Sequence, residues 1–286
     1  ALCYSEIAAM IPVAGSAYTY TYATMGEFMA WMVGWILMLE YAIGNITVAS
    51  AWTGYFVQFL KGFKHVLPDF VVNFPMWLRN DYRFMFAYCD KFGLDPHTQM
   101  PYLFDKIPVA INLPAIAIVL ALTLLLIKGV KESTRVASIM VGVNMFMILS
   151  FICVGAFYVK PENWVPFAPN GFEGVFMGAF LIFFAYIGFD AISTTAEETE
   201  NPQRDLPIAI LGTLIICTIL YVCVALVLTG TVPLGHIDIQ APIAHAMRAI
   251  GINWFAGLIS IGALCALTSV LLIYQLGTTR ILYAMS

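Results

Sequence analysis

The sequence has few charged residues, since only 10% of its 286 residues are Asp, Glu, Lys or Arg. A soluble domain carries about 25% charged residues, so this chain lacks the side chains that would cover a water-facing surface. It also lacks a basic excess, because its formal net charge is −4, which excludes the footprint of a nucleic-acid binder. With 61% hydrophobic residues and a mean hydropathy of +0.87, the composition predicts a polytopic membrane protein.

The motifs of enzymes and metal centres are missing as well. No pair of the six cysteines has the C-x-x-C spacing of a metal or redox site, and the four histidines do not cluster. The sequence holds no nucleophile elbow, P-loop or dinucleotide-binding fingerprint. We therefore expect no enzymatic activity, no cofactor and no metal site. Cys89 lies in a polar segment, where we expect an unpaired loop thiol.

Long uncharged runs follow one another along the chain, and a helix needs about 20 such residues to cross a bilayer. The segment 61–106 contains four prolines, which is typical of a loop. The first residues, 1–12, resemble the second half of a span, so we expect an internal part of a larger protein. The distribution of Lys and Arg leaves the orientation open. The predicted complete spans are 27–60, 107–127, 136–159, 170–196, 206–235 and 249–279.

Two carboxylates lie inside these runs, where an ionisable group costs a few kcal/mol and is a functional candidate by default. Glu40 shares one helix face with small or polar residues, which is typical of a face that packs on protein or lines a cavity. We expect Glu40 either to take part in proton coupling or to bond to a neighbouring helix. The residues that share the face of Glu40 are Gly44, Thr47, Ala51 and Gly54. The second carboxylate inside these runs is Asp190.

The run that leads to Asp190 is short and rich in glycine. Its uncharged core, residues 174–189, has 16 residues, or about 24 Å as a helix, against about 30 Å of hydrocarbon. This pattern predicts a discontinuous helix of the kind found in secondary transporters, although an ordinary tilted span with a glycine packing pair remains open. A break would free the carbonyls of Phe184, Ala185 and Ile187 for an ammonium group. Asp190 would then begin or stabilise the second half-helix.

Three further polar residues are weaker candidates. Asn144 is the strongest hydrogen-bonding side chain of the run 136–159. The hydroxyls of Thr268 and Ser269 share a helix face in the last run. They either coordinate a cation or simply pack, and packing is favoured.

Several motifs resemble the amino acid permeases of the amino acid–polyamine–organocation superfamily. Residues 4–9 with 12–18 are similar to the end of helix 2 of that superfamily, and Phe184–Asp190 resembles the unwound centre of helix 6. Residues 196–202 and 206–210 resemble the entry into helix 7. Two further stretches, 129–133 and 160–164, narrow the resemblance to the cationic amino acid transporter branch.

The resemblance implies an all-α polytopic membrane protein with a LeuT-type five-plus-five inverted repeat, alternating access and a discontinuous helix 6. Residues 1–286 would form part of one transporter domain, from the end of helix 2 through helix 8, multi-pass in the cell membrane. The segment 61–106 would be an enlarged extracellular loop, and the loop from Lys128 to Arg135 would face the cytoplasm.

The resemblance also implies roles for individual residues. The substrate ammonium would meet the carbonyls of Phe184, Ala185 and Ile187 beside Gly188. Phe184 would close over the substrate as a gate, and Tyr221 would lie near the substrate side chain. Glu40 and Asp190 match positions tied to coupling and pocket organisation, and Asn144 matches an ion-site position. Thr268 and Ser269 stay ion-site-like candidates by their residue type.

The expected function is secondary active transport of an L-amino acid, with an amino acid, protons and the lipid bilayer as partners. Asn144 stands where some relatives carry a lysine that replaces a sodium ion, which leaves an exchanger or facilitator without proton coupling open. A transporter-like amino acid sensor is a further alternative. The branch allows a small single-span membrane subunit as a partner, although no residue of this sequence indicates one. The sequence leaves the choice between cationic and neutral amino acids open.

Overall fold

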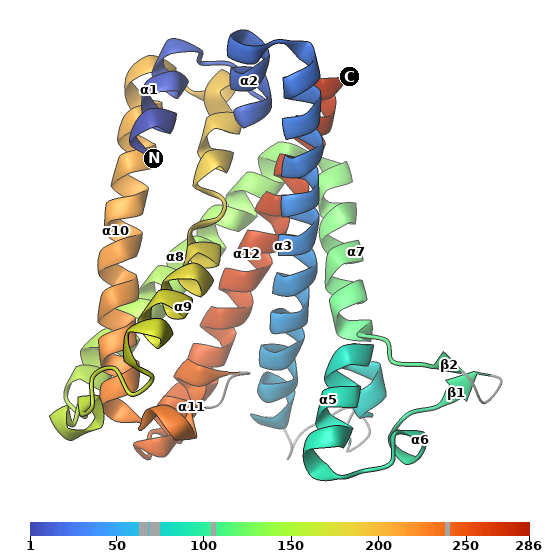
Figure 1. Cartoon of the computed structure of the whole chain (residues 1–286), viewed down its shortest axis with the longest axis vertical. Helices are drawn as coiled ribbons and strands as arrows, with labels where there is room; N and C mark the ends of the chain where they lie inside the picture. The colour runs from blue at the N-terminus through green and yellow to red at the C-terminus, as the bar shows by residue number, and fades with distance from the viewer. Residues whose placement is uncertain (63–67, 69–74, 104–106, 238–240) are drawn as a thin grey trace. The chain divides into compact units, whose positions relative to one another are not determined.

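The computed structural model describes residues 1–62, 68, 75–103, 107–237 and 241–286. The chain divides into two compact units, and each is described here by itself (Figure 1). The first unit comprises residues 1–44, 150–236 and 273–286, and the second comprises residues 45–149 and 237–272.

Helices dominate the described residues, and five helical segments are long and apolar enough to cross a membrane. These segments are Glu27–Lys61, Arg135–Ala156, Gly171–Glu197, Pro202–Thr231 and Trp254–Met285. An all-α polytopic membrane protein, as predicted from composition, is therefore confirmed. The long helices are α3 (Glu27–Gly62), α8 (Val130–Ala156), α9 (Gly171–Phe183), α10 (Pro202–Thr231) and α12 (Asn253–Met285), and α7 (Leu113–Lys128) is a shorter apolar helix.

Short helices precede and connect the long ones along the chain. Two of them, α1 (Leu2–Met10) and α2 (Ala17–Met25), open the chain. Others are α11 (Pro242–Ala249) and the 3₁₀ turns η2 (Pro161–Trp164) and η5 (Leu234–His236). The 3₁₀ segments η3 (Phe184–Tyr186) and η4 (Phe189–Glu198) follow α9.

Two predicted runs begin at the wrong residue. The run 107–127 becomes helical only at Leu113, because Asn112 caps the helix: its Oδ1 accepts a hydrogen bond of 3.1 Å from the Ala115 N–H. The run 249–279 joins two elements, since α11 ends at Ala249 and α12 begins at Asn253. Hydropathy does not register a capping residue, which explains the first error. It does not register a turn either, and the second run is interrupted by the turn that contains Gly251, whose φ is +86°.

The predicted loop between Lys128 and Arg135 is also wrong. Helix α7 extends to Lys128 and α8 begins at Val130, so Gly129 alone separates them. Gly129 has a φ of +150°, in the region that favours glycine. The charged residues that follow it therefore form the first turns of α8 rather than a loop.

The segment 61–106 contains regular structure where a loop was predicted. Its described residues form η1 (Met76–Leu78), α5 (Tyr82–Phe92), α6 (Pro96–Gln99) and the two-residue strand β1 (Tyr102–Leu103). This strand pairs antiparallel with β2 (Ile107–Pro108), which directly follows the segment. Cys89 is not an exposed loop thiol. It is a free cysteine that packs with Met85 and Met100 in a small core, as buried cysteines commonly do.

Each unit has its own apolar core. In the first unit, Ala8 of α1, Tyr20 of α2, Ala196 of η4 and Leu206 and Ile210 of α10 form one cluster. This cluster fixes the second part of the broken segment against α1 and α10. In the second unit, residues of α3, α7 and α12 pack together, namely Ala49, Ala115, Leu122, Leu271 and Leu272.

Candidate substrate site

The segment 171–198 is interrupted in the middle. Helix α9 ends at Phe183, one 3₁₀ turn follows as η3, and the chain extends at Ile187, which has ψ of +135°, before η4 begins (Figure 1). The predicted discontinuous helix is confirmed. The alternative of an ordinary tilted span is excluded by this geometry.

Gly188 makes the interruption possible. Its φ of +105° and ψ of −4° lie in the left-handed region, where a side chain with a Cβ is strained. A Cβ at Gly188 would meet no atom within 4 Å. The backbone conformation, and not a lack of space, therefore requires glycine here.

The second half of the segment is a 3₁₀ helix rather than an α-helix, which sequence reasoning did not anticipate. Three consecutive hydroxyl side chains, those of Ser193, Thr194 and Thr195, donate to the carbonyls three residues earlier at 2.6–2.7 Å. Such local side-chain bonds compete with the regular helical pattern. They stabilise a 3₁₀ segment, whose backbone hydrogen bonds have poorer geometry than those of an α-helix.

Two of the three carbonyls expected to be free have partners. The Tyr221 hydroxyl of α10 donates to the Ala185 carbonyl at 2.9 Å, and the Ile187 N–H donates to the Phe184 carbonyl at 3.3 Å. In the part of the chain that the structure describes, the Ile187 carbonyl accepts no hydrogen bond. Because a carbonyl oxygen has two lone pairs, the occupied oxygens can still accept a second bond.

Tyr221 and Phe184 thus lie at the break, on two elements of the same unit. The ring of Tyr221 lies 5.3 Å from that of Tyr186 in an edge-on arrangement, and the Tyr186 hydroxyl bonds to that of Thr218 at 3.0 Å. The side chain of Phe184 is 42% exposed. The break therefore joins open backbone oxygens to an aromatic wall, and Tyr186 belongs to it although sequence reasoning did not single it out.

Asp190 is buried and accepts two hydrogen bonds on the same oxygen. Its Oδ2 receives the Tyr41 hydroxyl of α3 at 2.6 Å and the Ser16 hydroxyl at 3.0 Å. The Tyr4 hydroxyl of α1 bonds in turn to the Ser16 hydroxyl. Asp190 lies in the first turn of η4, where a negative charge is favourable, in line with the expectation that it would begin or stabilise the second half-helix. The N-cap residue is Gly188, and there is no side-chain cap.

Ser16 occupies a strained backbone conformation. Its φ of +55° and ψ of −143° are rare for any residue except glycine, and such conformations cost about 1–3 kcal/mol. Ser16 is fully buried. The hydrogen bonds of its hydroxyl to Asp190 and Tyr4 hold Ser16 in place. Sequence reasoning did not single out Ser16, and the one signal for it is the Gly15–Ser16 pair between α1 and α2.

Glu40 precedes Tyr41 on α3 and interacts electrostatically with Asp190. The face that it shares with Gly44 packs closely on α12: a Cβ at Gly44 would lie 3.0 Å from the Tyr274 ring. The contact is reciprocal, because a Cβ at Gly277 would lie 2.6 Å from the Tyr41 ring. Within this unit the structure therefore brings both carboxylates to one tyrosine-lined region.

The ion-site candidates belong to the other unit. Asn144 is half-buried on α8. Thr268 is buried, donates to the Leu264 carbonyl at 2.6 Å and accepts from the Trp52 indole at 2.9 Å. Ser269 donates to the Ala266 carbonyl at 2.7 Å. These bonds are those of hydroxyls in a packed helix face.

The interrupted apolar segment, with carbonyls open beside an aromatic wall, defines a helical membrane protein of the discontinuous-helix type. Its family follows from the sequence as a whole. The chain belongs to the amino acid permease family, whose model, described as "Amino acid permease", matches residues 1–286. The predicted membership of the amino acid–polyamine–organocation superfamily is confirmed.

Curated relatives match over the full chain or nearly so. The branched-chain amino acid permease BcaP of Bacillus subtilis (strain 168) is 44% identical over 287 residues, a match that covers 100% of this chain and 56% of BcaP. The methylthioribose transporter of the same organism is 39% identical, with 100% and 56% covered. Cationic amino acid transporter 9, chloroplastic, of Arabidopsis thaliana is 39% identical, with 96% and 44% covered. The chain thus spans about half the length of these relatives.

The names of these relatives include branched-chain as well as cationic amino acids. Restriction to the cationic branch therefore stays a prediction. The relatives are named permeases and transporters and carry no enzyme name.

Proposed function

We propose that the whole protein is a secondary transporter that moves an L-amino acid across the cell membrane by alternating access. The observation that supports this most is the break at Ile187–Gly188, which leaves the Ile187 carbonyl open within an apolar segment. A carbonyl without a partner in a membrane is costly, and an ammonium group supplies the missing donor. The names of the relatives support an amino acid as the substrate.

In this proposal Phe184 acts as the gate and Tyr221 positions the break. Phe184 begins η3 directly after α9, and its side chain is 42% exposed, so a small rotation of η3 would move its ring over a bound substrate. The hydroxyl of Tyr221 ties η3 to α10 through the Ala185 carbonyl. Movement of α10 would therefore be transmitted to the gate.

Glu40 and Asp190 are proposed to carry the proton coupling. Both are acidic, they interact as like charges, and Asp190 is held by neutral hydroxyls rather than by a cation. Adding a proton to one member of such a pair relieves the repulsion. Proton entry would then change the contacts that hold η4, which follows the substrate site directly.

The test is uptake of a panel of the twenty amino acids by the full-length protein in vesicles with an imposed pH gradient. We expect Glu40→Gln to reduce gradient-driven accumulation at least tenfold while binding changes less than threefold. The control Glu173→Gln removes an exposed carboxylate at the start of α9 and should behave as the wild type. Unchanged accumulation with Glu40→Gln would exclude its role.

The gate has its own test. Phe184→Ala should lower the uptake rate at least tenfold, because the substrate is then no longer enclosed. The control Phe180→Ala removes an exposed ring from the same helix one turn earlier. Normal uptake with Phe184→Ala would remove Phe184 as a gate.

A second candidate is exchange without protons, which Asn144 favours because it is neutral. Uptake that depends on amino acid inside the vesicle, and not on pH, would identify an exchanger. Binding without any flux would identify a sensor.

A further inference from the structure

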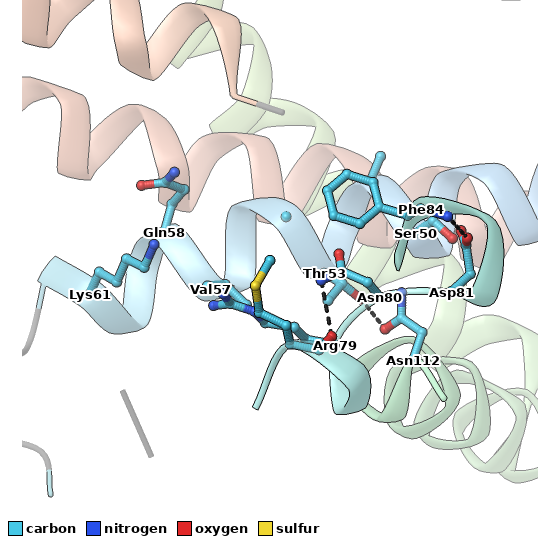
Figure 2. Close-up of a pocket in the computed structure, with 13 residues that line it drawn as sticks. Ser50, Thr53, Val57, Gln58, Lys61, Arg79, Asn80, Asp81, Phe84 and Asn112 are labelled. Atoms are coloured by element: carbon cyan, nitrogen blue, oxygen red, sulfur yellow. Dashed lines mark hydrogen bonds between the residues drawn. The ribbon is translucent and has the colours of Figure 1, made fainter. Parts of the chain in front are cut away.

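A cavity of about 320 Å³ lies between the end of α3 and the segment that contains η1 and the start of α5 (Figure 2). Every residue that lines it belongs to the second compact unit. It therefore shares no residue with the break at Ile187–Gly188. Its volume is at the lower end of the range of small-molecule sites.

Arg79 is the notable residue of this cavity. Its guanidinium is half-buried, and among the described residues it makes neither an ion pair nor a hydrogen bond. Burial lowers the pKa of Arg79, and the one nearby group that acts in the opposite direction is the phenol of Tyr88. An arginine stays charged in a protein all the same, so a cation with five N–H donors faces the cavity. The carboxylate of Asp81 also lines the cavity, but it accepts from the Phe84 N–H at 2.7 Å and forms no ion pair with Arg79 among the described residues.

The other polar groups of the lining are largely engaged in holding its walls. The Thr53 hydroxyl donates to Asn112 Oδ1 at 2.7 Å, and the Asn80 amide donates to the Met76 carbonyl at 3.1 Å (Figure 2). Gln58 Oε1 accepts from Arg248 at 3.1 Å. The walls are therefore fixed before any ligand enters, which lowers the entropic cost of binding.

Apolar side chains complete the lining. Val57 on α3 and Met76 and Phe84 on the other segment all contribute to it, and Figure 2 shows the ring of Phe84 and the side chain of Val57 among the polar groups. The charged side chains of the lining are Lys61, Arg79 and Asp81, so the cations outnumber the carboxylate. A fixed cavity with this excess of positive charge and an apolar wall suits a small molecule that has a carboxylate and a short carbon chain.

We propose that this cavity is a second binding site, which holds a free amino acid by its carboxylate on Arg79. The inference rests on the proposed function, because transport supplies the amino acid as the solute to be captured. The lining comes from the segment 61–106 and the adjoining end of α3, which we propose to face the outside. The site would collect substrate there before transport.

The experiment counts bound ligand on the full-length protein by equilibrium dialysis with radiolabelled L-valine and, in parallel, L-arginine. We expect two sites per chain for the transported amino acid. Arg79→Gln should reduce this to one, or weaken the second site at least tenfold, as loss of a charge-assisted bond does. Arg83→Gln, the matched control, removes an exposed arginine that does not line the cavity, and it should keep both sites.

Two further arms protect the test against misfolding and against another ligand. Ala51→Leu narrows the cavity from α3 while Arg79 stays in place, and it should abolish the same site. Isobutyrate, which keeps a carboxylate, should displace the ligand from the Arg79-dependent site, whereas isobutylamine should not. Displacement by isobutylamine alone would overturn the proposal.

The failure of this proposal is distinguishable from that of transport. Normal transport by the wild type, together with one bound ligand that Arg79→Gln leaves unchanged, would refute the second site alone. A wild type that neither binds nor transports any of the twenty amino acids would refute the proposed function, and the second site with it.

Discussion

The strained serine between α1 and α2 offers a test in which two similar substitutions should differ. Ser16 combines a backbone conformation suited to glycine with a hydroxyl that bonds to the buried Asp190. Ser16→Ala removes the hydroxyl and keeps the strain. Ser16→Gly removes the same hydroxyl but relieves the strain. The difference between the two variants therefore isolates the backbone contribution from the hydrogen bond.

The magnitudes follow from the contacts of Ser16. A hydrogen bond to a charged group contributes about 1.5–3 kcal/mol, and the strained conformation costs about 1–3 kcal/mol. Ser16→Ala should thus destabilise the protein by about 1.5–3 kcal/mol. Ser16→Gly should recover the strain of about 1–3 kcal/mol, less up to about 1 kcal/mol for its more flexible unfolded chain.

The assay is the thermal unfolding midpoint of the full-length protein in one detergent at fixed protein concentration. We expect Ser16→Ala to lower the midpoint by about 3–10 °C, with Ser16→Gly between it and the wild type. Ser50→Ala, a substitution on α3 that touches neither group, is the control. If the alanine variant matched or exceeded the glycine variant in stability, the argument from strain would be refuted.

Two other substitutions follow from single contacts. Gly277→Ala would place a methyl group 2.6 Å from the Tyr41 ring, so we expect overpacking to lower the free energy of unfolding by about 1–3 kcal/mol. The measurement is the unfolding midpoint, which should fall. An unchanged midpoint would contradict the close packing. Tyr221→Phe removes the hydroxyl from the Ala185 carbonyl at a cost of about 1 kcal/mol. We expect a several-fold change in the half-saturating substrate concentration with little loss of protein, and unchanged kinetics would show that this bond does not position the break.

Composition and periodicity predicted the membrane class and the position of the break, because both depend on local sequence. The shortage of charge indicated a membrane protein, and the short glycine-containing run 174–189 indicated a discontinuity that the backbone dihedrals confirm. Helix ends were less predictable. The first turn of α7 depends on the side chain of Asn112, and the boundary of α8 depends on the conformation of Gly129. Neither changes the hydropathy of the run.

The partners of Asp190 could not be predicted for a different reason. Ser16 and Tyr41 lie 174 and 149 residues away in the sequence, so their proximity is set by the fold alone. The same holds for the Tyr221 hydroxyl, whose bond to Ala185 closes one of the carbonyls expected to be free. The sequence predicted which residues lie at the break. It could not predict that the carbonyls of Phe184 and Ala185 already accept hydrogen bonds within the protein.

The two halves of the broken segment differ in what holds them, and this difference explains how the site could move. Helix α9 has regular backbone bonds, whereas η4 is a 3₁₀ segment whose position depends on tertiary contacts with α1, α3 and α10. A 3₁₀ helix of ten residues is longer than such helices usually are, so its own propensity does not fix it. The hydroxyls on Asp190 therefore set where η4 lies. A change in the charge of Asp190 would alter those bonds. Because Gly188 alone separates η4 from Ile187, a displacement of η4 would reach the Ile187 carbonyl, which we propose to bind the substrate ammonium.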